Sequence, residues 1–295
     1  MAKTHITNFP WTGSLSPGSK ENSMQELITE YRPFFDLIKT NRKKSVVYDD
    51  VYYVAIDAEW YEAGGRNVVL SYQLATVSES AINNIILYMS PGKRLELCEL
   101  VEAGIKSVNG GQLPPFKSGR KVRVILIAHN FTAEWSVLAD RDSDYITKNL
   151  MVIRKTPVTK SPININLSDY TPVDVEFFDS MHLAPAGYKS LQAMSTLLGD
   201  NSLEKDDIAQ VDKENMNLFL QRDPVGFERY ALRDTEVTLR LFVLLQKSLN
   251  MLAFGEIRQL FRTLAAASVD GFLESNPWFV NYRKALRRPE FWDAN

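Results

Sequence analysis

The sequence has few residues of the types that crosslink proteins or bind soft metals. Its 295 residues include one cysteine, Cys98, and three histidines. A single cysteine excludes an intramolecular disulfide framework and argues for a reducing compartment. With so few thiol and imidazole ligands, a zinc site of the common kind is not expected. We therefore expect an intracellular protein whose chemistry depends on other side chains.

Long apolar runs and a strong net charge are also missing. The chain has no apolar run close to the roughly 18 to 20 residues that cross a bilayer, so we expect no membrane partner. Its net charge is −2, with 24% charged and 45% apolar residues. This composition is typical of a soluble globular protein with one large or two small domains. It predicts no generally basic surface, although a local patch is still compatible with a nucleic-acid partner.

The distribution of residue types divides the chain into three segments. Residues 1–45 read as an N-terminal arm and helix: the first 23 are rich in Pro, Gly, Ser and Thr, and the helical spacing that follows is broken at Pro33. Residues 46–250 carry the strand and helix patterns of a domain. Residues 251–295 read as a C-terminal helix and a basic, aromatic tail. The tail aromatics are expected to cover the domain's own core, with partner binding and base stacking as the alternatives.

Periodicity in the middle segment predicts strands first and then strands alternating with helices. Expected strands cover 51–57, 67–77, 83–90, 122–130 and 175–183, and expected helices cover 94–108, 132–141, 188–199 and 223–252. Gly199 follows one helix as a C-terminal cap, and Asp223 with Pro224 opens the last. Residues 142–174 give no clear pattern. This order favours an α/β fold with a mixed β-sheet flanked by helices.

Two acids follow the apolar strand residues at 51–56. Asp57 and Glu59 are two apart, so a strand places both side chains on one face, and we expect them at the strand's end. Two unpaired carboxylates this close repel each other, and a divalent cation such as magnesium or manganese removes that penalty. The alternative is a strand end that frays into solvent, where acids cost little.

Two further places supply acids to the ends of other elements. Glu134 lies in the first turn of the helix after the buried strand 122–130, where the helix dipole alone would also favour an acid. Tyr230 and Asp234 are four apart and share one face of the long helix. If that face is exposed, they are an ordinary surface pair. The ordered combination of these acids is stronger evidence than any one of them.

The combination resembles the DEDDy 3′-5′ exonucleases, which have an RNase H-like fold. A strand with Asp-x-Glu (57–59), a strand and loop with His-Asn-x-x-x-acid (129–134) and a helix with Tyr-x-x-x-Asp (230–234) occur in the family's order. The chain is most similar to the proofreading domain of family B DNA polymerases of phages and plasmids, over roughly residues 51–249. The resemblance implies a cytoplasmic protein of a bacterial or phage-infected cell.

The resemblance also implies roles for individual residues. Two divalent cations, Mg²⁺ or Mn²⁺, would be held by four carboxylates and would hydrolyse phosphodiesters at the 3′ end of single-stranded DNA. Tyr230 would orient the attacking water, and Asn130 would contact the terminal nucleotides. Asp179 would support the site from behind its ligands, with a strand-end cap as the alternative. The implied ligands are Asp57, Glu59, Glu134 and Asp234.

Two departures from the family's pattern leave alternatives open. The usual residue at position 134 is Asp, and the longer Glu134 displaces its carboxylate by more than an ångström if the backbone is unchanged. The alternative to an active enzyme is therefore a catalytically impaired module that binds nucleic acid or docks on a polymerase. The sequence also lacks polymerase domains, so a separate polymerase subunit is a candidate partner. RNA is an open alternative substrate.

Overall fold

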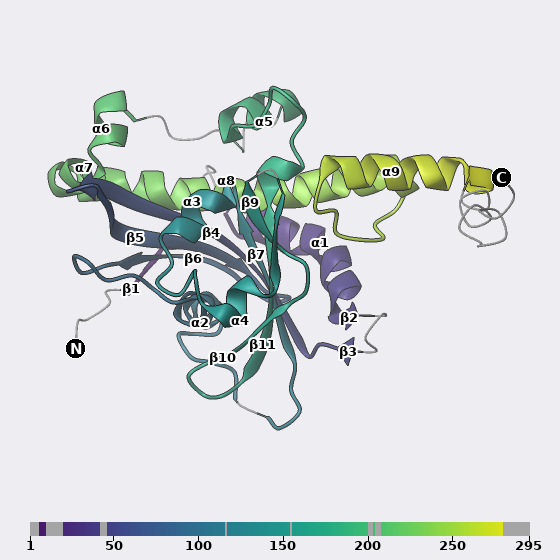
Figure 1. The fold of residues 1–295 in the computed structure, drawn as a ribbon, viewed down its shortest axis with the longest axis horizontal. Helices are drawn as coiled ribbons and strands as arrows, with labels where there is room; N and C mark the ends of the chain where they lie inside the picture. Colours follow the sequence, from purple (N-terminus) through teal and green to yellow (C-terminus); the bar gives the residue numbers. More distant parts are fainter. Residues whose placement is uncertain are drawn as a thin grey trace, which may run out of the picture.

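The computed structural model describes residues 6–9, 20–41, 46–115, 117–153, 155–199, 203 and 208–279. In this part of the chain one large mixed sheet has helices on both faces (Figure 1). Its strand order is β1-β6-β5-β4-β7-β11-β10. The strands are β1 (Ile6–Phe9), β4 (Asp50–Ala63), β5 (Arg66–Val77), β6 (Ile82–Tyr88), β7 (Val122–Ala128), β10 (Ile163–Asn166) and β11 (Pro172–Asp179). Two small ribbons pair β2 (Thr40–Asn41) with β3 (Val46–Val47) and β8 (Leu150–Ile153) with β9 (Thr156–Thr159).

The five central strands have the order and directions of an RNase H-like sheet. β4, β5 and β6 form an antiparallel meander, and β4, β7 and β11 are parallel neighbours. The β4–β5 connection is a two-residue loop, Gly64-Gly65, in which both residues have positive φ. Such a turn has the twist that joins two antiparallel strands directly, and glycine adopts it without strain. The predicted α/β fold class, a mixed sheet flanked by helices, is confirmed.

Two helical layers enclose the sheet. On one face, α1 and α8 pack over the odd-numbered residues of β4 such as Tyr53 and Ala55. On the other face, α2 and α3 cover even-numbered residues such as Val54 and Ile56. The helices are α1 (Lys20–Lys39), α2 (Leu97–Ser107), α3 (Phe131–Ser136), α4 (Asp144–Thr147), α5 (Leu191–Leu198), α6 (Gln210–Glu214), α7 (Met216–Arg222), α8 (Pro224–Phe254) and α9 (Leu264–Ser275), with a 3-10 turn, η1, at Ser180–His182.

The long helix α8 begins and ends as its sequence predicts. The Asp223 side chain accepts a hydrogen bond from the Gly226 backbone N–H, and Pro224 occupies the first turn. Gly255, in the left-handed region at φ 73°, ends the helix. Among the described residues, α8 alone has the length and hydropathy of a membrane-crossing helix. Because 61% of its most apolar stretch is buried inside the protein, it is a core helix.

The N-terminal arm, helix α1 and residues 142–174 differ from what the sequence pattern suggests. The expected irregular arm contains β1, which pairs with β6 at the edge of the sheet. The helix α1 continues through Pro33 because Tyr31 and Phe34, on either side of it, are buried in the core while Pro33 faces outward. Residues 142–174, which had no clear pattern, hold α4, β8, β9 and β10. The domain boundaries stay a prediction, although α1 shares the core of α8 through the Tyr31 hydroxyl, which donates to the Leu239 carbonyl at 2.7 Å.

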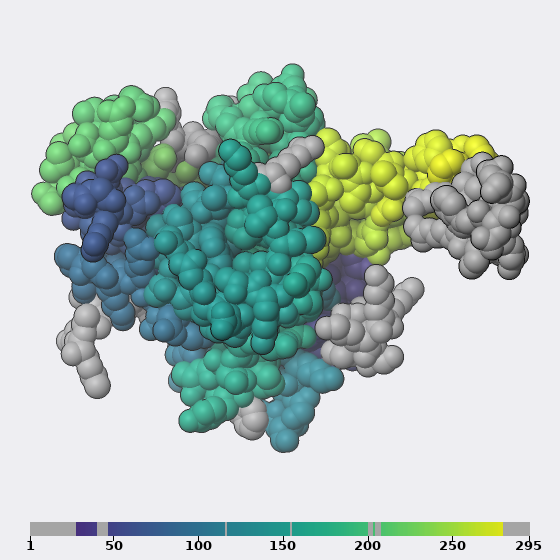
Figure 2. Space-filling model, in the orientation of Figure 1, coloured from purple at the N-terminus to yellow at the C-terminus, as the bar shows by residue number. Residues whose placement is uncertain are grey.

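The C-terminal segment is only partly described. Helix α9 stands out from the body of the molecule in Figure 2. Trp278 is 64% exposed, so the expectation that it covers the core is wrong for this residue. Phe279 packs edge-on against Phe272 of α9. The tail aromatics Tyr282, Phe291 and Trp292 lie outside the described residues.

Candidate active site

The two acids of β4 lie within the strand, beyond the end of its neighbour. β4 runs on to Ala63, so the expectation that the strand stops at Asp57 and Glu59 is wrong. The parallel pairing of β4 with β7 ends at Ala55, whereas its antiparallel pairing with β5 continues to the hairpin. The acids are therefore held by β5 on one side only. Both are half-buried, at the open end of the sheet's parallel part.

The two carboxylates share the face of the sheet that α8 covers. Side chains two apart on a strand lie on one face, and the preceding odd-numbered residues, Tyr53 and Ala55, belong to the core beneath α1 and α8. Asp57 and Glu59 continue this row past the end of the apolar packing. A register shift between Glu59 and Trp60 marks a bulge directly after the pair. Bulges of this kind redirect side chains and are common beside active sites.

Glu134 comes to the same place from helix α3. Its side chain is 4% exposed, although the helix begins at the surface-facing end of β7. The pKa of Glu134 is well above its ordinary value, first because of burial and then because of the negative charges of Asp57 and Glu59. A hydrogen bond to Asp57 raises the pKa further. Glu134 therefore lies close enough to Asp57 and Glu59 for their negative charges to act on it.

Asp179 supports the loop that carries Asn130 and leads into α3. It is the last residue of β11, level with Ala128 at the end of β7. Its carboxylate accepts hydrogen bonds from the backbone N–H groups of Asn130 and Phe131, both at 3.0 Å, and of Met181, at 2.9 Å. The strand-end cap, one of the two alternatives, is therefore present, and the support of the site stays a prediction.

Asn130 has a backbone conformation that few residues adopt. Its φ of 75° and ψ of 60° lie in the left-handed region, which costs most side chains about 1–2 kcal/mol and asparagine less. Its side chain is exposed and makes no cap to α3. The turn directs the chain from β7 into α3, so that the Asn130 side chain lies at the surface while Glu134 lies inside.

We predict that Asp179→Ala destabilises the fold by about 3 kcal/mol or more, because each hydrogen bond to a charged group contributes about 1.5–3 kcal/mol and three backbone donors lose their acceptor, while removal of a negative charge near Glu134 offsets part of the loss. Urea unfolding measures this change. Asp169→Ala is the matched control, since Asp169 accepts one backbone N–H, from Thr171, in a surface turn. A loss no greater than that of the control would show that Asp179 does not hold the loop.

Tyr230 and Asp234 lie on the part of α8 that crosses the sheet at the level of the acids. Asp57 is paired across the sheet with Gln73 and then Ile86, and Ile86 packs against Ala231 and Leu232 of α8. One row further, Asn84 of β6 donates a hydrogen bond to Glu236 of α8 at 2.7 Å.

The burial of these two α8 residues follows from this position. Asp234 is 7% exposed, and it shares a helix face with Val237, which enters the core of Tyr53 and Ala55. Tyr230 is half-buried against the cluster that contains Phe227. The alternative of an ordinary surface pair is therefore wrong for Asp234.

The acids fit a divalent cation in chemistry but are not arranged as a finished site. Carboxylate oxygens are the ligands that Mg²⁺ and Mn²⁺ prefer. The buried Oε2 of Glu134 accepts no hydrogen bond from the described residues. As placed, however, no three Asp, Glu, His or Cys side chains in the described part of the chain form a group that could hold a metal ion. Ion binding would therefore require rotation of these side chains.

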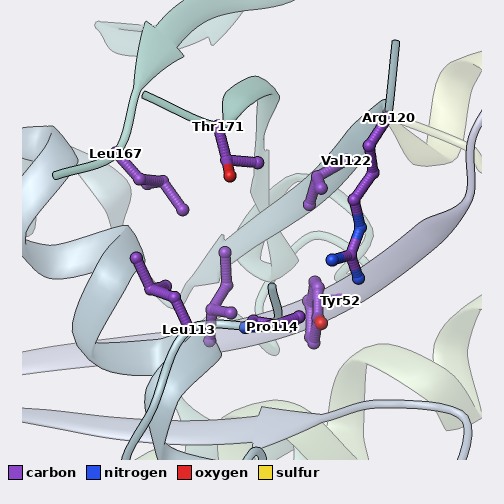
Figure 3. A pocket seen from close by; sticks show the side chains of 8 residues that line it. Tyr52, Leu113, Pro114, Arg120, Val122, Leu167 and Thr171 are labelled. Carbon is purple, nitrogen blue, oxygen red and sulfur yellow. The ribbon is translucent and has the colours of Figure 1, made fainter. Parts of the chain in front are cut away.

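A small pocket elsewhere on the sheet is separate from these residues. Tyr52, Val122 and Thr171 line it, near the starts of β4 and β7 (Figure 3). Tyr52 is five residues before Asp57, or about 16 Å along a strand that rises about 3.3 Å per residue. Arg120, at the edge of this pocket, is paired with Asp50: its Nε donates a hydrogen bond to the Asp50 carboxylate at 2.6 Å. The pocket does not belong to the acidic site.

Sequence reasoning missed two polar residues beside the acids and undervalued a third. Ser71 and Gln73 of β5 lie opposite Glu59 and Asp57 and are fully buried. Two polar residues at alternate positions in the middle of the strand 67–77 were the available signal. His129 connects two segments: its Nε2 donates to the Lys189 carbonyl at 2.6 Å, and its Nδ1 lies 2.9 Å from Ser180 Oγ.

Comparisons with solved structures give distant likenesses, two of which are described here. No protein-family model matches the chain, and no curated protein matches it. Phi29 DNA polymerase, solved with primer-template DNA and incoming nucleotides, is 16% identical with a TM-score of 0.40. The match covers 76% of this chain and 34% of the polymerase. The Drosophila P element transposase strand transfer complex is 11% identical with a TM-score of 0.23, covering 90% of this chain and 58% of the transposase. At these values the fold assignment depends on the strand order described above.

Proposed function

We propose that the chain is a metal-dependent 3′-5′ exonuclease that hydrolyses phosphodiesters at the 3′ ends of single-stranded DNA. The observation that carries this proposal is that the buried Glu134 lies close enough to Asp57 and Glu59, at the open end of the sheet, for their charges to raise its pKa. Buried carboxylates that crowd together lower the stability of a fold, so their convergence needs a chemical reason. A divalent cation would supply that reason by neutralising their negative charge.

The proposal gives each of these residues a role. Asp57, Glu59, Glu134 and Asp234 would hold two divalent cations. Bound Mg²⁺ or Mn²⁺ would lower the pKa of water and neutralise charge on the phosphoryl oxygens. The Tyr230 hydroxyl, which donates and accepts hydrogen bonds without charge at neutral pH, would orient the water for attack. Asp179 keeps the α3 loop in place, and thereby Glu134 within the cluster.

The direct test uses a single-stranded DNA oligonucleotide labelled at its 5′ end, with Mg²⁺ or Mn²⁺ and the protein in excess. We expect a ladder of products shortened from the 3′ end. The same oligonucleotide with a blocked 3′ end should stay intact, which separates exonuclease from endonuclease cutting. An RNA oligonucleotide of the same sequence tests the alternative substrate. No shortening in either metal, under enzyme excess, would overturn the proposal.

A second candidate function is a nucleic-acid-binding module that does not cut. Two observations favour it: position 134 is a glutamate, and the acids do not form a finished metal group within the described residues. On this reading the protein binds the oligonucleotide without shortening it, in either metal. Glu134→Asp would then create cutting activity, because the shorter side chain lets the carboxylate retreat from Asp57. An exonuclease would instead lose activity or keep it with this change.

For the exonuclease, we predict that Asn130→Gly weakens binding of the DNA end without unfolding the protein. Glycine adopts the left-handed conformation of this position freely, so the change removes the side chain alone. Loss of one or two hydrogen bonds should raise KM for the oligonucleotide about tenfold, since about 1.4 kcal/mol corresponds to a factor of ten. Steady-state kinetics measure KM, and thermal unfolding checks that Tm is unchanged. An unaltered KM would remove Asn130 from the binding surface.

A further inference from the structure

β5, the strand beside the acids, changes from apolar to polar side chains at the positions that face the acids of β4. In the antiparallel β4–β5 pair, Asp57 is opposite Gln73 and Glu59 is opposite Ser71. Residues directly opposite share one face, with Cβ atoms about 4.5–5.5 Å apart. The two preceding rows on this face are apolar on both strands, with Ala55 opposite Ala75. The polar rows of β5 thus coincide with the acidic rows of β4.

Ser71 and Gln73 are buried without the full set of partners that burial normally requires. Both are 0% exposed. The Gln73 Nε2 donates to Ser71 Oγ at 2.7 Å, and the Gln73 Oε1 accepts no hydrogen bond from the described residues. A buried amide oxygen without a donor costs free energy that an apolar side chain would not. The packing of this face does not explain the pair, because Ala75 and Val77 of the same strand fill it with apolar atoms.

The geometry points to Ser71 and Gln73 as positioning residues that hold the carboxylates of Glu59 and Asp57 in the rotamers that bind a cation. The inference rests on the proposed function. Rotation about the last torsion of Gln73 exchanges its oxygen and nitrogen at little cost, because such sp³–sp² torsions are roughly two-fold. The amide N–H then turns to Asp57. The Ser71 hydroxyl has a hydrogen to donate, either to Gln73 Oε1 or to Glu59.

In this arrangement β5 provides side-chain partners beside Asp57 and Glu59 at a level that β7 does not reach. Because β7 ends before their level, β5 is the neighbouring strand that can orient them from the side. Partners that orient metal ligands typically change metal affinity by about 10–100-fold when they are removed. Gln73 and Ser71 touch neither substrate nor cation in this role. Their effect is therefore expected on cation affinity, not on the KM for DNA.

The test measures the Mn²⁺ concentration that gives half of the maximal increase in Tm. Gln73→Leu removes the amide at nearly constant volume. Ser71→Ala removes only one hydroxyl, so it provides a second, milder variant if Gln73→Leu does not fold. Thr76→Val is the matched control: Thr76 lies on the same strand, is 0% exposed and has an Oγ1 without a hydrogen bond, but it faces the other side of the sheet. Asp57→Asn measures any increase in Tm that Mn²⁺ produces by binding outside the acidic site.

We expect Gln73→Leu to raise this Mn²⁺ concentration about tenfold or more. Ser71→Ala should give a smaller rise. Ser71→Thr, which keeps the hydroxyl, should have the same half-maximal Mn²⁺ concentration as the parent, and so should Thr76→Val. The cleavage rate of Gln73→Leu should recover at saturating Mn²⁺. If Mn²⁺ stabilises the parent and both variants equally, this inference is wrong and the proposed function stands. If Mn²⁺ does not stabilise the parent above Asp57→Asn, the cation site fails and this inference fails with it.

Discussion

Asp57→Asn is expected to reduce 3′-end cleavage by about a thousandfold or more while the protein stays folded. A cation at such a site supplies several kcal/mol of transition-state stabilisation, and each 1.36 kcal/mol is a factor of ten in rate. Asparagine keeps the shape of the side chain but removes the charge that binds the cation. It also removes one of the charges that crowd Glu134, so the variant should unfold at the same temperature as the parent or higher.

Single-turnover cleavage of the labelled oligonucleotide, with thermal unfolding of the same samples, measures both effects. Asp50→Asn is the control because it makes the same change at the other end of the same strand. Asp50 pairs with Arg120, away from the acids, so this variant should keep its cleavage rate even if it loses some stability. Equal cleavage by the parent and Asp57→Asn would mean that a contaminating nuclease, or a different site, cuts the DNA.

The acids could be found from the sequence because their spacing carries information at short range. The continuous apolar run 51–56 predicts a strand, and the two-residue period of a strand places Asp57 and Glu59 on one face, whatever follows in the chain. The end of the strand could not be found in this way. β4 continues to Ala63 because β5 pairs with it through the Gly64-Gly65 turn, and the end of β7 opens the site. The length of a neighbouring strand is a tertiary property that the local pattern does not contain.

Tertiary packing also explains the features that the sequence pattern predicted wrongly or did not reveal. A proline usually interrupts a helix, but Tyr31 and Phe34 bury enough apolar surface for α1 to continue past Pro33. Ser71 and Gln73 read as ordinary strand residues until the register places them opposite the acids. Burial of Glu134 and its contact with Asp57 likewise required the path of the loop that Asp179 holds.

Glu134→Gln is expected to stabilise the metal-free protein at neutral pH while abolishing its response to Mn²⁺. The buried carboxyl must either take up a proton or bear a charge beside Asp57 and Glu59, and a neutral amide of nearly the same shape avoids both costs. An increase in Tm of about 3 °C, which about 1 kcal/mol produces in a domain of this size, is sufficient to detect. Since Glu134 is one of the four proposed ligands, cleavage should fall together with the Mn²⁺ effect.

The pH dependence of this difference has a definite sign. The pKa of Glu134 is raised by burial and by its acidic neighbours above the ordinary value of 4.5. Between the ordinary and the raised pKa, the folded protein holds a proton that the unfolded chain releases, so the stability of the parent falls as pH rises through this window. Glutamine has no such proton. The two proteins should therefore be equally stable near pH 4, and the variant should gain on the parent as the pH increases.

Glu102→Gln is the control with the opposite sign. Burial of Glu102 raises its pKa, but hydrogen bonds from Lys106 and Ser168 outweigh this and leave the pKa lowered. Its carboxylate therefore stabilises the fold above the ordinary pKa, and that stability is lost as the pH falls. Glu102→Gln should destabilise at pH 8 and approach the parent at low pH, and Mn²⁺ should stabilise it as it stabilises the parent. A Glu134→Gln variant that behaves in this way would place Glu134 outside the acidic site, because its charge would then be favourable to the fold.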